Sequence, residues 1–140
     1  MTRDQSGAGG AVPRVLLIDD EDTIRFALRR FFSKLGWEVD DATDGGAALR
    51  KILDAPRAYY DVIISDLRMP GLSGVDFHDQ LASARPELLP HVVFSTGDLS
   101  SSDVADFVQR TNCLVLQKPF ELSALRETVQ RIASGDSPGP

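Results

Sequence analysis

The stretch VLLIDDED, residues 15–22, decides the fold class. Its first four residues are aliphatic, as expected for a short β-strand that is covered on both faces. Four carboxylates, Asp19, Asp20, Glu21 and Asp22, follow directly. Glu21 and Asp22 suit the first turn of a helix, where negative charge complements the helix dipole. Asp19 and Asp20 need another explanation, because adjacent carboxylates at the end of a buried strand repel each other.

The alternation of a short apolar run with a helical pattern recurs five times along the chain. The predicted strands are 15–19, 38–42, 62–65, 92–95 and 114–117. Apolar residues at spacings of three and four predict helices over about 24–35, 48–53, 75–84, 104–108 and 122–132. Gly36 is expected just after the first helix, and Ser100, Ser101 or Ser102 as N-cap of the fourth. Five βα units in series predict an α/β fold, with helices on both faces of a parallel sheet.

Length and composition indicate one globular domain, since the chain has 140 residues and is 42% hydrophobic. We expect this domain over 14–134, with flexible segments at 1–13 and 135–140 that are rich in small residues and helix breakers. The net charge of −6 argues against a nucleic-acid partner. No apolar run approaches the roughly 20 residues of a membrane span. The single Cys113, expected as a small buried hydrophobe, fits a reducing compartment, so a cytoplasmic protein without a membrane partner is predicted.

In a doubly wound sheet the carboxyl ends of the strands meet at one edge, where ligands bind. The polar residues expected there are Asp19, Asp20, Asp66, Thr96 and Lys118. Two carboxylates about 4 Å apart repel by roughly 4 kcal/mol at an effective dielectric near 20, and one lysine cannot neutralise three of them. A divalent cation can, and oxygen ligands favour Mg²⁺.

A metal beside a carboxylate, a hydroxyl and an ammonium group is suited to phosphoryl transfer. One carboxylate attacks phosphorus and becomes an acyl phosphate. Lys118 neutralises charge on the transferring oxygens, and Thr96 donates a further hydrogen bond. Gly97 has no side chain and leaves an approach for the donor.

The motifs VLLIDDE, VIISDLRMPGLSG, VVFSTGD and LQKPF, in this order and spacing, resemble the receiver domain of two-component response regulators. The resemblance covers about 14–133 and implies a flavodoxin-like (βα)₅ three-layer sandwich with strand order 2-1-3-4-5. It further implies a phosphorylation-dependent switch. A sensor histidine kinase or a histidine phosphotransfer protein would supply the phosphoryl group, and the domain would catalyse only its own phosphorylation and dephosphorylation. The motifs also resemble receivers of hybrid sensor kinases, so a free-standing protein and a piece of a hybrid kinase both stay open.

The resemblance implies a role for each residue of the constellation. Asp66 matches the phosphoacceptor, and Thr96 and Lys118 match the residues that bind the phosphoryl group. The implied Mg²⁺ ligands are Asp20 directly, Asp19 through water, Asp66, and Arg68 through its backbone carbonyl only. The peptide bond before Pro119 is commonly cis in the family.

Val115 departs from the family pattern. Three residues before the lysine the family often has a Tyr or Phe, which turns inward as the hydroxyl binds phosphate. The switch pair here is Thr96 and Val115, so the aromatic half is missing. The resemblance places the output surface on the fourth helix, fifth strand and fifth helix. A downstream protein is the expected partner there, and a homodimer is an open alternative.

Two functions of other classes compete with this interpretation. An aspartyl-phosphate phosphatase would need a second acid two residues after the nucleophile, where this chain has Arg68. A pseudo-receiver with an idle pocket would lack some of the key residues, all of which are present. His78 and His91 are expected at the surface and not as phosphodonors, because no helix carries a kinase-like histidine motif.

Overall fold

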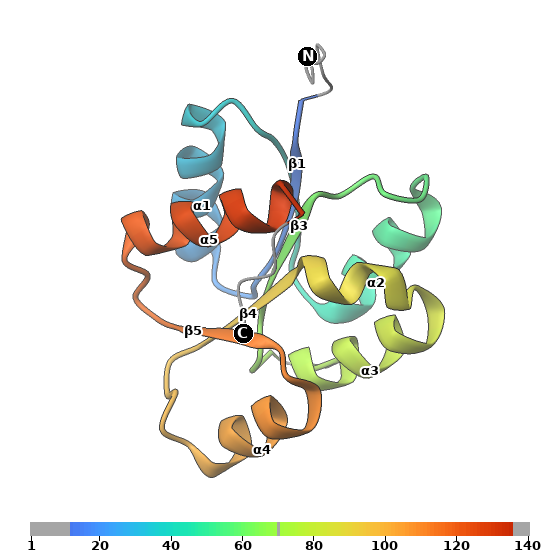
Figure 1. Cartoon of the computed structure of the whole chain (residues 1–140), viewed down its shortest axis with the longest axis vertical. Helices are drawn as coiled ribbons and strands as arrows, with labels where there is room; N and C mark the ends of the chain where they lie inside the picture. Colours follow the sequence, from blue (N-terminus) through green and yellow to red (C-terminus); the bar gives the residue numbers. More distant parts are fainter. Residues whose placement is uncertain (1–11, 70, 136–140) are drawn as a thin grey trace.

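The computed structural model describes residues 12–69 and 71–135, so the predicted flexible ends fall almost entirely outside it. Within these residues, five strands alternate with five α-helices and one short 3₁₀ helix, η1 (Figure 1). The elements are β1 (Arg14–Ile18), α1 (Asp22–Lys34), β2 (Glu38–Ala42), α2 (Gly45–Asp54), β3 (Val62–Asp66), α3 (Gly74–Ala84), η1 (Pro86–His91), β4 (Val92–Thr96), α4 (Ser102–Thr111), β5 (Leu114–Gln117) and α5 (Leu122–Ala133). The strands pair in parallel in the order β2-β1-β3-β4-β5. The predicted flavodoxin-like α/β fold is confirmed.

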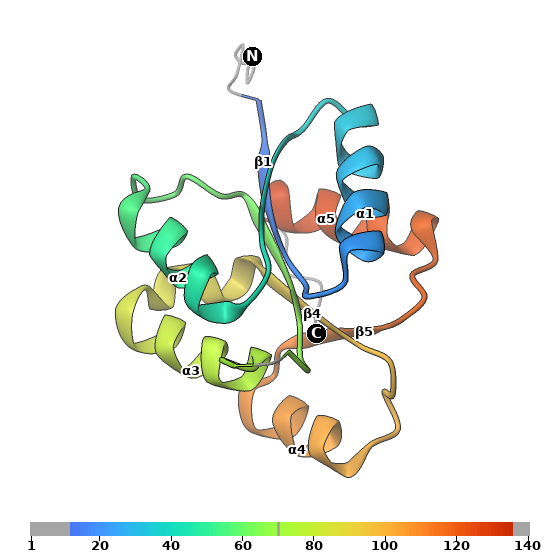
Figure 2. The same cartoon turned by 180° about the vertical axis from the view of Figure 1, so that it is seen from behind.

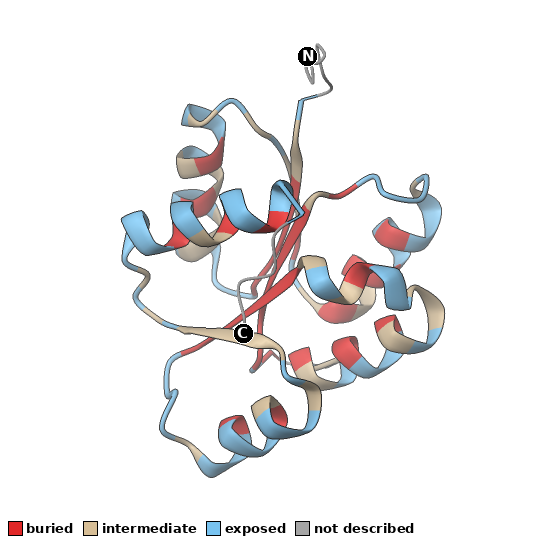
Figure 3. Ribbon diagram, viewed as in Figure 1, coloured by how far each residue is buried: buried red, intermediate tan, exposed pale blue. Residues whose placement is uncertain are grey.

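Helices cover both faces of the sheet. α1 and α5 lie on one face, and α2, α3 and α4 on the other (Figures 1 and 2). In β1, Val15 and Leu17 pack toward α1 and α5, whereas Leu16 and Ile18 pack toward the opposite helices. Successive strand residues point to opposite faces, so a strand covered on both sides has to be apolar throughout. Figure 3 shows the resulting buried centre, with β1, β3 and β4 in red.

The carboxyl ends of three strands differ from the predicted ones by one residue, while β2 and β5 have the predicted bounds. β1 ends at Ile18, while β3 and β4 continue to Asp66 and Thr96. Asp19 leaves the strand because its carboxylate accepts a hydrogen bond from the Glu21 amide at 2.9 Å, which turns the chain into α1. η1 was not predicted, since six residues with two prolines carry no helical period.

Local capping follows the predicted chemistry. Ser101 is the N-cap of α4, and its hydroxyl accepts from the Val104 amide. Gly36 follows α1 with a φ of 87°, the left-handed conformation that glycine adopts without strain. Gly74 opens α3 directly against the end of β3: a Cβ there would lie 2.4 Å from the Asp66 carbonyl oxygen. This close approach fixes the loop that follows Asp66.

The prediction of a surface position for His78 was wrong. Its residue is only 7% exposed, and its ring lies edge-on against Phe107, with ring centroids 5.4 Å apart. Position 78 is one turn from positions 74 and 81, so it shares the buried face of α3. His91 is half-buried, and its Nδ1 lies 2.9 Å from the Asp61 carbonyl oxygen. Cys113 is half-buried and packs against the core beneath α2, α3 and α4.

Candidate functional site

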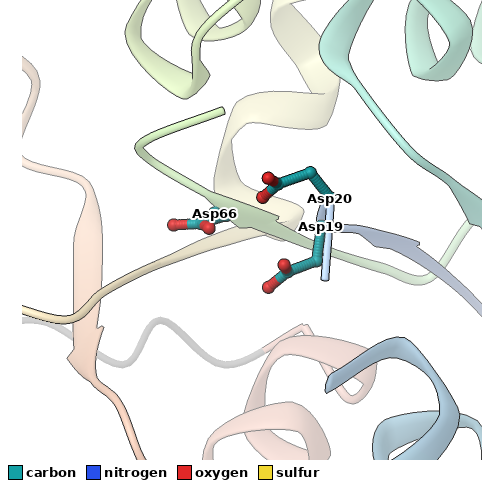
Figure 4. Close-up of side chains that lie close together, drawn as sticks. All are labelled: Asp19, Asp20 and Asp66. Carbon is teal, nitrogen blue, oxygen red and sulfur yellow. The ribbon is translucent and has the colours of Figure 1, made fainter. Parts of the chain in front are cut away.

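Three carboxylates meet at the carboxyl ends of β1 and β3. Asp19, Asp20 and Asp66 each offer one oxygen within 4.8 Å of the other two, and their side chains point to the same side (Figure 4). Asp19 and Asp66 are buried, whereas Asp20 is exposed. The sheet order explains the meeting, because β1 and β3 are direct neighbours with their carboxyl ends level.

Lys118 reaches this cluster from the end of β5. Its Nζ lies 2.8 Å from Asp19 Oδ2, 3.1 Å from Asp66 Oδ2 and 3.5 Å from Glu21 Oε1. The Lys118 amide donates to the Thr96 carbonyl at 2.8 Å, which holds the start of the loop beside β4. The Lys118–Pro119 peptide bond is cis, as the family resemblance implies.

The lysine and the buried carboxylate respond differently to their surroundings. Burial disfavours the charged form of Lys118, but the hydrogen bonds and charges of Asp19 and Asp66 outweigh it and raise the lysine pKa. Burial also raises the pKa of Asp66; the Arg68 amide and Lys118 oppose this rise without cancelling it. The Lys118 ammonium contacts both Asp66 and Asp19, and the Asp19 carboxylate also repels the carboxylate of Asp66. The pocket is therefore short of positive charge.

Asp20 is the carboxylate of the trio that the described residues leave without a hydrogen bond or ion pair. Asp19 has both oxygens engaged, one by the Glu21 amide and one by Lys118. Three carboxylates and one ammonium carry a net charge of −2, and the donors are hard oxygens. These residues fit Mg²⁺, and an acidic triad of this kind is typical of a Mg²⁺ site.

Thr96 lies beside the acidic cluster as the last residue of β4, and it is fully buried. The register pairs Asp66 with Ser95, directly before it. The Thr96 hydroxyl oxygen accepts from the Asp98 amide at 3.2 Å, which leaves its hydrogen for another acceptor. Val115 lies on β5, the strand next to β4; it pairs with Phe94 and is half-buried.

Arg68 divides its contacts between two sites. Its backbone amide donates to Asp66 Oδ1 at 3.2 Å, while its guanidinium points to α4 and donates to Ser101 Oγ at 3.1 Å. The assignment of its backbone carbonyl to a metal stays a prediction. Sequence reasoning missed two contacts, Glu21 with Lys118 and Arg68 with Ser101. The run of acids at 19–22 could have indicated the contact of Glu21 with Lys118. The contact of Arg68 with Ser101 joins two separate loops, and no sequence pattern indicates it.

Comparisons with known proteins agree with this geometry. The family model of the response regulator receiver domain matches residues 15–130. Regulatory protein AtoC of Escherichia coli (strain K12) is 32% identical over 124 residues, which cover 86% of this chain and 25% of AtoC. The chain thus spans a quarter of that relative's length.

Solved structures resemble the whole described domain. Chemotaxis protein CheY4 of Vibrio cholerae aligns with a TM-score of 0.74 and 30% identity, covering 87% of this chain and 99% of that chain. Response regulator protein TrrA from Thermotoga maritima, solved in complex with Mg²⁺-BeF, aligns with a TM-score of 0.72 and 27% identity, covering 86% and 99%.

No helix within the described residues 12–69 and 71–135 combines the length and the apolar character needed to cross a membrane.

The five-stranded sheet, the acidic triad with its lysine and the match over 15–130 lead to one conclusion. The chain belongs to the response regulator receiver domain family, and it is a phosphorylation switch rather than an enzyme that turns over a substrate.

Proposed function

We propose that this receiver accepts a phosphoryl group on Asp66 from the phosphohistidine of a histidine kinase. The observation that carries the proposal is the shared Lys118 ammonium, which contacts Asp66 and Asp19 at 3.1 and 2.8 Å while Asp20 lies in the same cluster. Buried carboxylates held around one ammonium, with a third acid beside them, suit a site that gains a dianionic group and a dication together.

The transfer makes one bond and breaks one. An oxygen of Asp66 attacks phosphorus and forms a P–O bond; the P–N bond to the donor imidazole breaks, and the imidazole keeps the electron pair and takes up a proton. Lys118 faces Asp66 Oδ2 and neutralises charge on the transferring oxygens. The Thr96 hydroxyl donates its free hydrogen to one of them.

The remaining residues of the cluster would hold Mg²⁺. Asp20, exposed and without a partner among the described residues, would be the direct ligand, together with Asp66 and the Arg68 carbonyl. Asp19 already binds the Glu21 amide and Lys118, and would act on the metal through water. Bound Mg²⁺ neutralises charge on the phosphoryl oxygens. TrrA, which is 27% identical, was solved in complex with Mg²⁺-BeF, and this supports a Mg²⁺ site in the present chain by similarity.

Incubation with acetyl phosphate and Mg²⁺ tests the proposal. The wild type should gain the mass of one phosphoryl group, and hydroxylamine should remove it, as expected of an acyl phosphate. Asp66→Asn should gain nothing, while Asp106→Asn, a surface acid on α4, should behave as wild type. An unchanged wild-type mass would indicate an idle pseudo-receiver, and sustained release of phosphate from a generic ester would indicate a phosphatase.

The histidine kinase family is the expected donor class, and we propose that either a kinase or a histidine phosphotransfer protein can serve. The output partner would be a protein at the face formed by α4, β5 and α5, rather than nucleic acid or a membrane. β5 is an edge strand of the sheet, and Leu122 at the start of α5 is 54% exposed. A second copy of the chain is the alternative occupant. Phosphotransfer from a panel of kinases, with Asp66→Asn as control, identifies the donor.

A further inference from the structure

Arg68 connects the phosphoacceptor to α4 through a single residue. Its backbone amide contacts Asp66 Oδ1 at 3.2 Å. Its guanidinium donates to Ser101 Oγ at 3.1 Å and lies 3.9 Å from Asp103 Oδ2. Ser101 is the N-cap of α4, and Asp103 lies in its first turn.

The same contact spans a groove of about 660 Å³ between the loop after β3 and α4. Arg68 lies on the loop side and Asp103 on the helix side. The groove has an apolar lining that includes Met69, Val104 and Phe107. The Arg68 side chain therefore links the two walls at this end of the groove.

The contact of the Arg68 guanidinium with Ser101 and Asp103 is weak enough to be replaced by a contact with another acceptor. The Arg68 and Asp103 side chains are 59% and 83% exposed, and exposed ion pairs change an equilibrium by no more than about fivefold. By contrast, a phosphoryl group offers three acceptor oxygens and close to two negative charges, which arginine binds in bidentate geometry.

We propose that the Arg68 side chain is a phosphorylation-sensitive strap that holds the first turn of α4 until Asp66 is phosphorylated. The guanidinium then turns from Ser101 and Asp103 to the phosphoryl oxygens, and the first turn of α4 is released. Arg68 is placed to do so because its backbone amide lies 3.2 Å from Asp66 Oδ1, so its side chain starts next to the acceptor. The inference rests on phosphorylation at Asp66. It gives the signal a route to α4 that does not need an aromatic residue at position 115.

Hydrogen exchange of the full chain, with and without Mg²⁺ and beryllofluoride as phosphoryl mimic, tests the strap. Fluorine NMR measures how much mimic is bound. In the wild type the Val104 and Ala105 amides, which bond to Ser101, should exchange up to about fivefold faster once the mimic is bound. In Arg68→Ala they should exchange at the fast rate already without the mimic, and saturating mimic should add little.

Arg110→Ala is the matched control. Arg110 lines the other end of the groove and pairs with Asp79 on α3, without contact to Asp66 or Ser101 among the described residues. It should keep the wild-type response. If the wild type binds the mimic and its α4 amides do not change, or if Arg68→Ala still responds, the strap is wrong while phosphorylation at Asp66 stands. If the wild type accepts neither phosphoryl group nor mimic, the proposed function fails and the strap fails with it.

Discussion

The variant Asp20→Asn removes two contributions of Asp20 at once: the charge repulsion that it adds to the metal-free cluster and the ligand that it supplies to the metal. Lys118 bonds directly to Asp19 and Asp66, and no described residue pairs with Asp20. Without metal, Asp20 therefore adds repulsion that the protein does not compensate. With metal, it supplies a ligand. Asp20→Asn should make the metal-free protein more stable and the metal-bound protein less so.

The size of the effect follows from the geometry of the cluster. At the outer separation of 4.8 Å, one pair of unit charges repels by about 0.9 kcal/mol in water and about 3.5 kcal/mol at a dielectric near 20. Asp20 is exposed, so the lower figure applies to most of the field it feels. Its two pairs, with Asp19 and Asp66, sum to about 1–2 kcal/mol. This is the expected gain in the free energy of unfolding of the metal-free variant at neutral pH and low salt.

Urea unfolding in EDTA and in Mg²⁺ measures both halves of the prediction. At Mg²⁺ about 100 times its Kd the wild type gains about 2.7 kcal/mol, and a variant with a tenfold higher Kd gains about 1.4 kcal/mol. High salt should shrink the metal-free difference, because screening weakens the repulsion. Asp106→Asn, which removes one surface acid from α4, should show neither effect. Equal stabilisation of wild type and Asp20→Asn by Mg²⁺ would refute the ligand assignment, and a less stable metal-free variant would refute the repulsion argument.

Three further perturbations test the site. Lys118→Met should cost about 3–5 kcal/mol of stability, because it leaves Asp19 and Asp66 buried without their cation, and should abolish labelling by acetyl phosphate; urea midpoints and intact mass measure the two effects. Asp66→Asn should be more stable than metal-free wild type at neutral pH, where ionisation of Asp66 against its raised pKa opposes folding; urea curves should show the gain vanishing as pH falls through that pKa toward the ordinary value of 3.8. Gly74→Ala should cost about 1–3 kcal/mol, since its Cβ would meet the Asp66 carbonyl at 2.4 Å, whereas Gly97→Ala meets nothing within 4 Å and should unfold at the wild-type midpoint.

Sequence patterns predict this fold well because its strands are buried on both faces. Residues 62–65 and 92–95 are apolar or small throughout, and only the central strands of a covered sheet need that composition. η1 escaped because a six-residue 3₁₀ helix has no amphipathic period. His78 was misplaced for a related reason: the buried face of α3 accepts its polar ring because the ring packs against Phe107 of α4, which the sequence of α3 does not encode, while Nδ1 contacts the neighbouring Asp79.

The candidate site was predictable to the extent that topology alone gathers its residues. Strand order brings Asp19, Asp66 and Lys118 to one edge of the sheet, so knowing where the strands end was sufficient. The direction of a long surface side chain is a different matter. Arg68 binds α4 instead of the carboxylates two residues away, and this choice depends on Ser101, 33 positions later. Such contacts are decided by the packing of two loops.

The packing around Val115 explains why the first turn of α4 is the part of this helix that we expect to respond to phosphorylation of Asp66. Val115 pairs with Phe94 and packs against the core that contains Phe94 and Phe107. Those two rings are 5.1 Å apart and edge-on, 0% and 3% exposed, so an aromatic side chain turned inward at 115 would overpack them at a cost of about 1–3 kcal/mol. Beyond Phe107, α4 is therefore fixed to β4 by packing. Its first turn packs through Val104 alone, and is held in addition by a cap and an exposed arginine. A charge added at Asp66 acts most easily there, because an exposed polar contact costs less to break than a ring stack.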